Sequence, residues 1–243
     1  MDRRSAVTYE RRFAALATVA SLFVLLLGFG RSFFFRPFFS GPPDYAALEP
    51  VFYVHGTVFA SWFVLLAVQT LLIRSRNLKL HRRLGFAGIA LAVLITGFGA
   101  YVALVAATRP GGFKDVPVPS EQFLIIPLSD VAFFAAYAGL GFHFRKNPAI
   151  HKRWIFLASA ALLEAAAVRI PLMLGVELPN FEIFTLGGLV GMLAIWDFVL
   201  LRRVHPVTLW GGVGMVVTMS LRLTIAESSM WQSFGRWAMG LMA

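Results

Sequence analysis

Five charged residues lie inside stretches of the chain that are otherwise almost entirely apolar. Asp197 is only five residues from a basic turn, whereas Asp130, Glu164, Arg169 and Arg222 are far from such turns. Within a lipid bilayer an ionisable side chain is costly unless it is paired or hydrated, and such residues often mark binding sites or proton pathways. Two acids and two arginines make a formally neutral set. The sequence therefore predicts that these side chains meet in one cluster, with Asp130 and Arg169 as the expected ion pair.

The same four residues are predicted to share one depth in the membrane. Counted at ~1.5 Å per helical residue from the nearest basic turn, they fall in a layer roughly 8 Å thick, in the half of the membrane far from those turns. By the same count, His55 lies just above this layer. An arginine offers a planar fork of donors, and a histidine exchanges protons near neutral pH.

Two interpretations of this layer stay open. The first is a ligand-binding or proton-handling site formed by Asp130, Glu164, Arg169, Arg222 and His55, suited to a quinone head group, a haem propionate or an amphipathic anion. The second is a buried ion-pair network that only fixes the register of the helices.

Three further histidines, His81, His151 and His205, lie next to basic turns. Segments Asn77–Phe86 and Asn147–Phe156 are similar, because each places a histidine and two basic residues at equivalent positions. A duplicated hairpin explains this similarity, and so does a general preference for polar residues at turns. A b-type haem held by two histidines needs ligands at matching depth on two helices. His81 and His151 are therefore the candidate haem ligands, and contacts with lipid head groups or backbone carbonyls are the alternative role.

Several other chemistries are excluded by residue counts and motifs. The chain has no cysteine, which excludes disulfides, thiolate metal sites, iron–sulfur clusters and covalently attached haem. Five histidines are too few for the histidine-rich ligand set of a diiron membrane hydroxylase. There is no HExxH motif, no glycine-rich phosphate loop and no plausible serine–histidine–aspartate order. An enzymatic activity is therefore neither indicated nor excluded.

The composition predicts a membrane protein whose elements are all helical. The 243 residues are 58% hydrophobic and 14% charged, and the mean hydropathy is +0.74. Each apolar stretch is near the ~20 residues that a helix needs to cross the hydrocarbon. We expect one integral membrane domain over 1–243, with seven helices, or six if Arg222 prevents the last from spanning. The stretches are 13–30, 51–73, 84–107, 122–144, 154–175, 181–201 and 207–226.

These stretches are expected to form an uncleaved anchor helix and hairpins. The anchor is 13–30, and the hairpins are 51–107, 122–175 and 181–226, followed by an interfacial helix over 228–243. The segment 31–50, rich in Phe, Pro and Gly, is expected to form an irregular flap at the membrane interface. Asp197 is expected to pair locally with the basic turn at Arg202.

Basic residues fall almost entirely on alternate turns, so the N-terminus is predicted to be cytoplasmic in a bacterial inner membrane. The net charge of +10 is explained by this orientation and by contact with anionic lipid head groups, and nucleic acid is not an expected partner. Arg31, Arg36, Arg109, Lys114 and Arg236 are the basic residues expected outside. Those expected inside are Arg3, Arg4, Arg11, Arg12, Arg74, Arg76, Lys79, Arg82, Arg83, Arg145, Lys146, Lys152, Arg153, Arg202 and Arg203.

Short motifs over roughly residues 51–172 resemble those of bacterial polytopic membrane protein families of uncharacterised function. More distantly, they are similar to the YozB-like proteins linked to cytochrome oxidase assembly. One departure is Ile155, where the resemblance leads us to expect Met. The resemblance implies a polytopic membrane protein close to haem or respiratory chemistry, without identifying a reaction. The motifs are His55-Gly56, Trp62, Gln69, His81-Arg82-Arg83-Leu84-Gly85, His151-Lys152-Arg153-Trp154 and Arg169-Ile170.

Two functions of different classes follow as hypotheses. The first is a haem- or quinone-associated protein of respiratory redox chemistry or its assembly, favoured by the resemblance. The alternative is a small transporter, or a protein that binds lipids or amphipathic anions, without redox chemistry. An absorption spectrum of the purified protein distinguishes them, because a b-type haem band that shifts on reduction requires the first. Neither the ligand nor the oligomeric state follows from the sequence.

Overall fold

A computed structural model describes residues 3–38, 48–113, 116–176, 178 and 181–242 of the chain. The side chains at 3–11, 13, 172, 173 and 182 are outside that description, as are Lys114 and the part of the predicted flap at 39–47. Every regular element of the described residues is helical. The elements are α1 (Arg3–Phe29), η1 (Gly30–Phe34), η2 (Arg36–Phe38), α2 (Pro50–Arg74), α3 (Leu78–Thr108), α4 (Ser120–Phe123), α5 (Ile125–His143), α6 (Pro148–Ala167), α7 (Arg169–Leu174), α8 (Phe181–Leu201), η3 (Val207–Gly211), α9 (Gly212–Ala226) and α10 (Ser229–Gly240).

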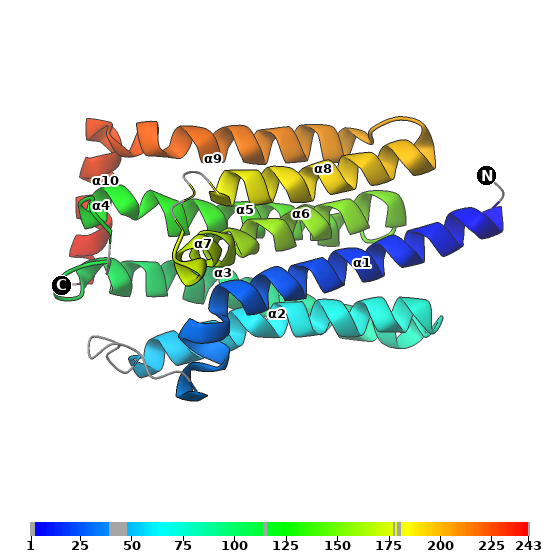
Figure 1. Cartoon of the computed structure of the whole chain (residues 1–243), viewed down its shortest axis with the longest axis horizontal. Coiled ribbons are helices and arrows are strands. Elements are labelled where there is room, and N and C mark those ends of the chain that lie inside the picture. The colour runs from blue at the N-terminus through cyan, green and yellow to red at the C-terminus, as the bar shows by residue number, and fades with distance from the viewer. Residues whose placement is uncertain (1–2, 39–47, 114–115, 177, 179–180, 243) are drawn as a thin grey trace.

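In the part of the chain that the structure describes, seven helical segments are long and apolar enough to cross a membrane, which confirms the predicted all-α polytopic bundle. The last segment, Val207–Ala226, includes Arg222 and still qualifies. The long helices lie side by side along the bundle, with the N-terminus at one end and the short helices α4 and α10 at the other (Figure 1). The chain is therefore a multi-pass membrane protein.

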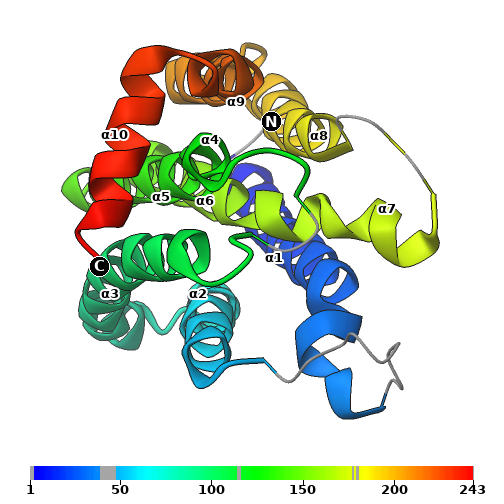
Figure 2. The same ribbon diagram turned by 90° about the vertical axis from the view of Figure 1, so that its left-hand side faces the viewer.

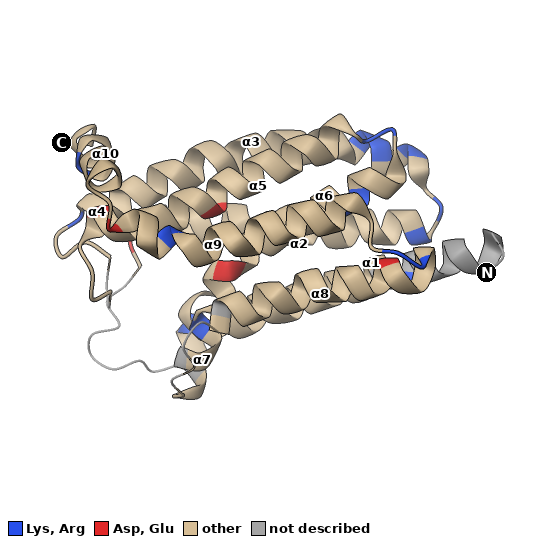
Figure 3. Ribbon diagram, turned by 90° about the horizontal axis from the view of Figure 1, so that it is seen from above, with Lys and Arg blue, Asp and Glu red and all other residues tan. Residues whose placement is uncertain are grey.

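The basic turns gather at one end of the bundle. Figure 3 shows the lysines and arginines concentrated over the turns at the end that carries the N-terminus. Two of these turns begin helices in the same way: the Asn77 side chain accepts from Leu80 N at 3.1 Å, and the Asn147 side chain accepts from the equivalent Ile150 N at 3.4 Å. Asparagine is a favoured helix N-cap. Capping therefore gives a physical reason for the recurring Asn of the two similar segments.

Helix α6 lies in the middle of the bundle, against α1, α5 and α8 (Figure 2). Its packing face is rich in alanine, and Ala158, Ala161 and Ala166 are fully buried. Helix α1 approaches α6 so closely at Gly28 that a side chain there would overlap the backbone of Ala166. Small side chains let membrane helices approach closely, and the van der Waals contacts formed in this way stabilise the helix pair in lipid.

The membrane segment of α6 continues through a break into α7. Val168 ends α6, and α7 leaves the bundle sideways from Arg169 (Figure 2). Pro171 has no N–H to give to the preceding turn, so a straight continuation of α6 is disfavoured. The sequence predicted one uninterrupted helix over 154–175, and the break changes where Arg169 points.

Helix α10 lies across the end of the bundle opposite to the basic turns (Figure 2). The Ser228 hydroxyl caps it by accepting from Trp231 N at 3.3 Å. Trp231 Nε1 donates to the Glu121 carbonyl at 2.9 Å, and a side chain at Gly235 would overlap the same residue. Trp237 stays 61% exposed. This arrangement suits the predicted interfacial helix, whose exposed aromatic face would lie among lipid head groups.

Candidate functional site

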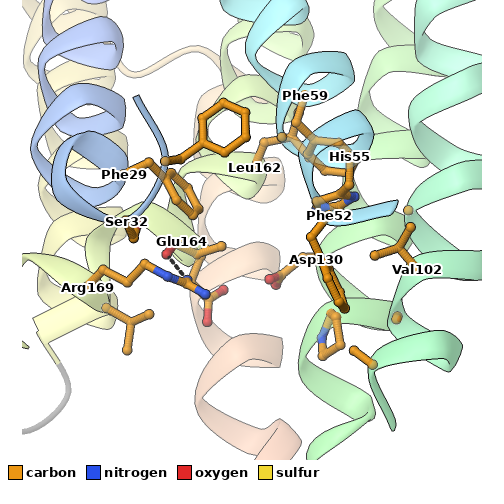
Figure 4. A pocket seen from close by; sticks show the side chains of 18 of the residues that line it. Phe29, Ser32, Phe52, His55, Phe59, Val102, Asp130, Leu162, Glu164 and Arg169 are labelled. Carbon is orange, nitrogen blue, oxygen red and sulfur yellow. Dashed lines mark hydrogen bonds between the residues drawn. The ribbon is translucent and has the colours of Figure 1, made fainter. Parts of the chain in front are cut away.

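A cavity of about 610 Å³ opens at the end of the bundle far from the basic turns. The ends of α1, α3 and α6 and the beginnings of α2 and α5 surround it. The five predicted site residues, from five different elements, all line this cavity: His55, Asp130, Glu164, Arg169 and Arg222. Figure 4 shows Arg169 on one side and His55 on the other, with Asp130 and Glu164 between them.

The walls of the cavity are mainly aromatic. The lining phenylalanines are Phe29, Phe33, Phe34, Phe52, Phe59, Phe63, Phe113 and Phe123. The His55 ring lies against Phe59 with 4.1 Å between ring centroids. Phe33, placed by the π-helical turn η1, packs directly on Gly56, where a side chain would overlap its ring. Such a surface favours a flat, apolar ligand body over a strongly hydrated one.

Arg222 forms ion pairs with both acids of the cluster. Its Nη1 donates to Asp130 Oδ1 at 2.9 Å and to Glu164 Oε2 at 2.9 Å, and its Nη2 pairs with Glu164 Oε1. All three residues are buried. The predicted pairing of Asp130 with Arg169 is therefore wrong. Helix α9 packs against α5, which brings Arg222 to Asp130, whereas Arg169 lies beyond the break that ends α6.

The two carboxylates are not equally satisfied. Glu164 receives hydrogen bonds on both oxygens from the Arg222 fork, and its side chain is 3% exposed. Asp130 is held through Oδ1 alone, and no hydrogen bond from a described residue reaches Oδ2. The Asp130 side chain is 11% exposed while it lines the cavity. One carboxylate oxygen is therefore open to the cavity.

Arg169 forms part of the opposite wall. It donates through Nη1 to the Ala165 carbonyl oxygen, one turn earlier in α6. Its guanidinium carbon lies 4.8 Å from the centroid of the Phe29 ring, which is a cation–π distance. The two contacts hold the guanidinium at the cavity surface, with Phe29 beside it.

Two further polar atoms at the cavity are buried without a hydrogen-bond partner among the described residues. They are His55 Nδ1 and Ser32 Oγ. Most buried polar atoms in proteins are paired, and an exception in a cavity wall is a place where a ligand or water completes the bonding. Ser32 belongs to η1 and was not predicted. The π-helical turn that places it leaves no signal in the sequence.

Three more charged residues line the cavity: Arg36, Glu49 and Arg109. The Arg109 guanidinium carbon lies 5.0 Å from the centroid of the Phe52 ring, and its Nε donates to the Gly112 carbonyl at 2.8 Å. Arg36 and Arg109 were predicted only as outer-loop charges, because nothing in their spacing marked them as cavity residues.

The candidate haem ligands lie elsewhere. His81 and His151 are at the N-terminal turns of α3 and α6, at the basic end of the bundle, and neither lines the cavity. The Nδ1 atom of His151 is 2.7 Å from the Gly141 carbonyl oxygen, a contact that fixes the ring. His55 is the single histidine among the described cavity residues, so a haem with two histidine ligands does not fit there.

A second buried charged cluster, at the basic end, was missed. The Arg153 fork binds the carboxylate of Asp197, with Nε donating to Oδ1 at 2.9 Å. Asp197 Oδ2 also accepts from the Thr208 hydroxyl and from His205 N at 3.1 Å. Arg153 and Asp197 are 1% and 0% exposed. Asp197 was expected to pair with the basic turn that begins at Arg202. It does accept from His205 N of that turn, but its ion pair is with Arg153, because α8 turns Asp197 toward α6.

The cluster of Arg153, Asp197 and Thr208 is named the inner cluster because it lies at the basic end of the bundle, and His205 borders it. Burial lowers the pKa of its ring below the ordinary value, and the nearby Arg153 lowers it further, whereas Asp197 acts in the opposite direction. Its Nδ1 accepts from Val207 N at 3.2 Å. A neutral ring is therefore part of the turn between α8 and η3.

Comparison of the chain with protein-family models, with curated proteins and with solved structures gives no match. The resemblance to YozB-like proteins therefore stays a prediction. Among the described residues, no group of three or more His, Asp or Glu side chains is arranged to hold a metal ion. Function is therefore inferred from the cavity and its lining residues.

Proposed function

We propose that this protein binds the head group of a membrane quinone in the outer half of a bacterial inner membrane. One observation carries the proposal: an aromatic cavity of about 610 Å³ has hydrogen-bonding groups on opposite sides. A quinone ring is flat and apolar, with an oxygen at each of two opposite edges. Arg169, which lies against Phe29, is placed to meet one oxygen, and His55, which lies against Phe59, is placed to meet the other.

The size of the cavity supports this proposal. Ligand pockets in proteins commonly have volumes of about 300–1,000 Å³, and an aromatic lining with a few convergent polar groups is typical of them. The polar groups of this cavity come from α2, α5, α6, α7 and α9, so a bound head group would connect most of the bundle. The predicted distant resemblance to proteins linked to cytochrome oxidase assembly implies haem or respiratory chemistry, which includes quinones.

The sidedness of the proposal follows from the basic turns and has its own test. Cysteines replacing Lys79 and Arg236 in this cysteine-free chain should be labelled from opposite sides of the membrane, Lys79→Cys from the cytoplasm. Arg236 is suitable because its side chain is 58% exposed on α10. Labelling of both cysteines by an impermeant maleimide added to intact cells would contradict the orientation.

A second candidate is the binding or transport of an anionic lipid or another amphipathic anion. The observation that favours it is the set of arginines in the cavity lining, which includes Arg36, Arg109 and Arg169. Guanidinium groups pair with phosphate and carboxylate through two parallel hydrogen bonds. A negatively charged head group would use these residues and would have less need of Asp130 or His55.

Identification of the co-purified ligand tests the two candidates. The protein is purified in mild detergent, its absorption spectrum is recorded before and after dithionite, and an organic extract is analysed by mass spectrometry. A quinone present at near-equimolar amount, and lost from the Arg169→Gln variant, is the expected result. Arg74→Gln, which changes an arginine at the other end of α2, serves as the control and should retain the quinone.

Other outcomes are equally informative. Phospholipid or another anion at that stoichiometry, sensitive to Arg169→Gln, would replace the quinone proposal with the second candidate. A reducible b-type haem band would support the haem hypothesis, and its loss in His81→Ala and His151→Ala but not in His55→Ala would assign the ligands. An extract without any stoichiometric ligand, from protein that also fails to bind added quinone, would contradict the proposed function.

A further inference from the structure

We propose that the cavity selects the reduced, hydroxyl-bearing form of its ligand, the quinol, through Asp130, with His55 as a second polar contact beside it. This inference rests on the proposed function and specifies which redox form the site holds. It follows from the hydrogen bonds that are not made in the cluster of Asp130, Glu164 and Arg222, named the outer cluster because it lies far from the basic turns. The proposal concerns only the binding of one redox form of the ligand and implies no electron transfer by this protein.

Asp130 lines the cavity, and only one of its two carboxylate oxygens accepts a hydrogen bond from a described residue. Arg222 has two partners, and its fork is used mainly by Glu164, which it binds on both oxygens. Asp130 receives one bond on Oδ1, and its Oδ2 has no hydrogen-bond partner among the described residues. A carboxylate accepts hydrogen bonds and cannot donate them. Oδ2 therefore requires a donor from whatever occupies the cavity.

The His55 ring lies nearer to Asp130 than Arg169 does (Figure 4). Its Nδ1 is buried without a hydrogen-bond partner among the described residues, and the ring is held by contact with Phe59. A neutral imidazole has one donor and one acceptor nitrogen. The ring therefore adds a second polar contact beside Asp130. This contact can be a donor or an acceptor, as the ligand requires.

The two ligand forms differ in what they can offer to Asp130 and His55. A quinol hydroxyl donates to Asp130 Oδ2 and still has lone pairs to accept from His55. A quinone carbonyl only accepts, so it would place its lone pairs against the carboxylate. The neighbouring charges do not reverse this preference, because Glu164 and Arg222 are bound to each other and Arg169 lies on the opposite wall.

The expected selectivity is large enough to measure. A hydrogen bond to a charged group corresponds to a factor of about ten to a hundred in affinity, and the quinone form additionally suffers the repulsion. The quinol should therefore bind at least about ten-fold more tightly than the quinone. Asp130→Asn should remove most of this difference, because an amide can donate to a carbonyl or accept from a hydroxyl.

The test is calorimetric titration, under anaerobic conditions, of the detergent-purified full chain with decyl-ubiquinone and with its reduced quinol. The wild-type protein should prefer the quinol, Asp130→Asn should bind both forms with similar affinity, and the control Val102→Ala should keep the preference. Val102 lines the same cavity with an apolar side chain. Thermal unfolding of each variant verifies that it is folded.

Each result decides between the two levels of the proposal. Equal affinities for both forms, or tighter binding of the quinone, in the wild-type protein would overturn the inference and leave the proposed function standing. A full preference retained by folded Asp130→Asn would also overturn it. Binding of neither form would contradict the proposed function itself. The wild-type comparison needs no variant, so the inference can fail even if Asp130→Asn does not fold.

Discussion

The two buried charged clusters of this bundle differ in how completely their hydrogen bonds are made. In the inner cluster the Asp197 carboxylate is surrounded by donors from Arg153, Thr208 and His205, and none of these residues lines the cavity. In the outer cluster two carboxylates share Arg222, and one oxygen of Asp130 faces open space. Both clusters are nearly equally buried, so burial alone does not separate them.

This difference separates a structural pair from a binding site. A buried ion pair is tolerated when every remaining donor and acceptor is satisfied, as around Asp197. An open acceptor in a low-dielectric wall is expensive, and it persists where a ligand or water completes it. We therefore expect substitutions in the inner cluster to change stability and substitutions in the outer cluster to change binding.

The largest expected effect is on stability, in the inner cluster. Asp197→Asn leaves the Arg153 guanidinium buried without a counter-charge, and breaking a buried pair in this way costs about 3–5 kcal/mol. A strongly lowered unfolding temperature, followed by tryptophan fluorescence in detergent, is the expected observation. Arg202→Gln, at the exposed turn beyond α8, is the matched control and should unfold near the wild-type temperature. Unchanged unfolding of Asp197→Asn would mean that the inner cluster does not stabilise the bundle.

The matched substitution in the outer cluster should have a smaller effect on unfolding. In Asp130→Asn, Arg222 keeps both hydrogen bonds to Glu164, so we expect a loss of about 1 kcal/mol, the scale of a single hydrogen bond. Its main consequence should be the altered binding described above. If Asp130→Asn and Asp197→Asn lower the unfolding temperature equally, the distinction between the two clusters is wrong.

A change in the aromatic wall tests the shape of the outer site without touching its charges. Gly56→Ala forces the Phe33 ring away from α2, because the added methyl group would occupy its position. Phe33 is a side chain in a cavity and has space to move, so we expect weaker ligand binding with a loss of stability below about 1 kcal/mol. Gly97→Ala, on the adjacent helix α3, meets no atom within 4 Å and is the control. Unchanged affinity in Gly56→Ala would show that Phe33 does not shape the site.

The smallest expected effect is a pH dependence of the inner cluster. Because burial lowers the pKa of His205 below its ordinary value of 6.5, the unfolded chain binds a proton more readily than the folded one. The contribution of His205 to stability should be complete above pH about 6.5 and decrease as the pH falls toward the lowered pKa. The wild-type protein should therefore lose more stability than His205→Gln between pH 7 and 5, measured by thermal unfolding. A larger loss in His205→Gln would contradict the direction of the shift.

Much of the architecture was predictable because lipid imposes simple requirements on a sequence. Apolar stretches of sufficient length identify the spans, and the positions of Asp130, Glu164, Arg169 and Arg222 along them predict a common depth. The structure brings all four to one cavity together with His55. Depth is encoded in the distance along each helix, which is why this part of the site could be predicted.

The pairing within each cluster was not predictable in the same way. It depends on how each helix is rotated and where it breaks. The end of α6 at Val168 directs Arg169 to Phe29. The packing of α9 on α5 brings Arg222 into contact with Asp130. Arg153 follows a lysine in a basic turn and looked like a surface charge, although it is fully buried. Distance along the chain carries no information about these rotations.

The central claim is that the outer cluster is a ligand site, and the most direct test is the change in unfolding temperature on adding decyl-ubiquinol. Saturating ligand at about a hundred times its dissociation constant stabilises the folded state by roughly 2.7 kcal/mol. We predict a clear rise for the wild-type protein and for Arg74→Gln, and little or no rise for the double variant Asp130→Asn with Arg169→Gln. No rise in the wild-type protein, or the same rise in the double variant, would contradict the account.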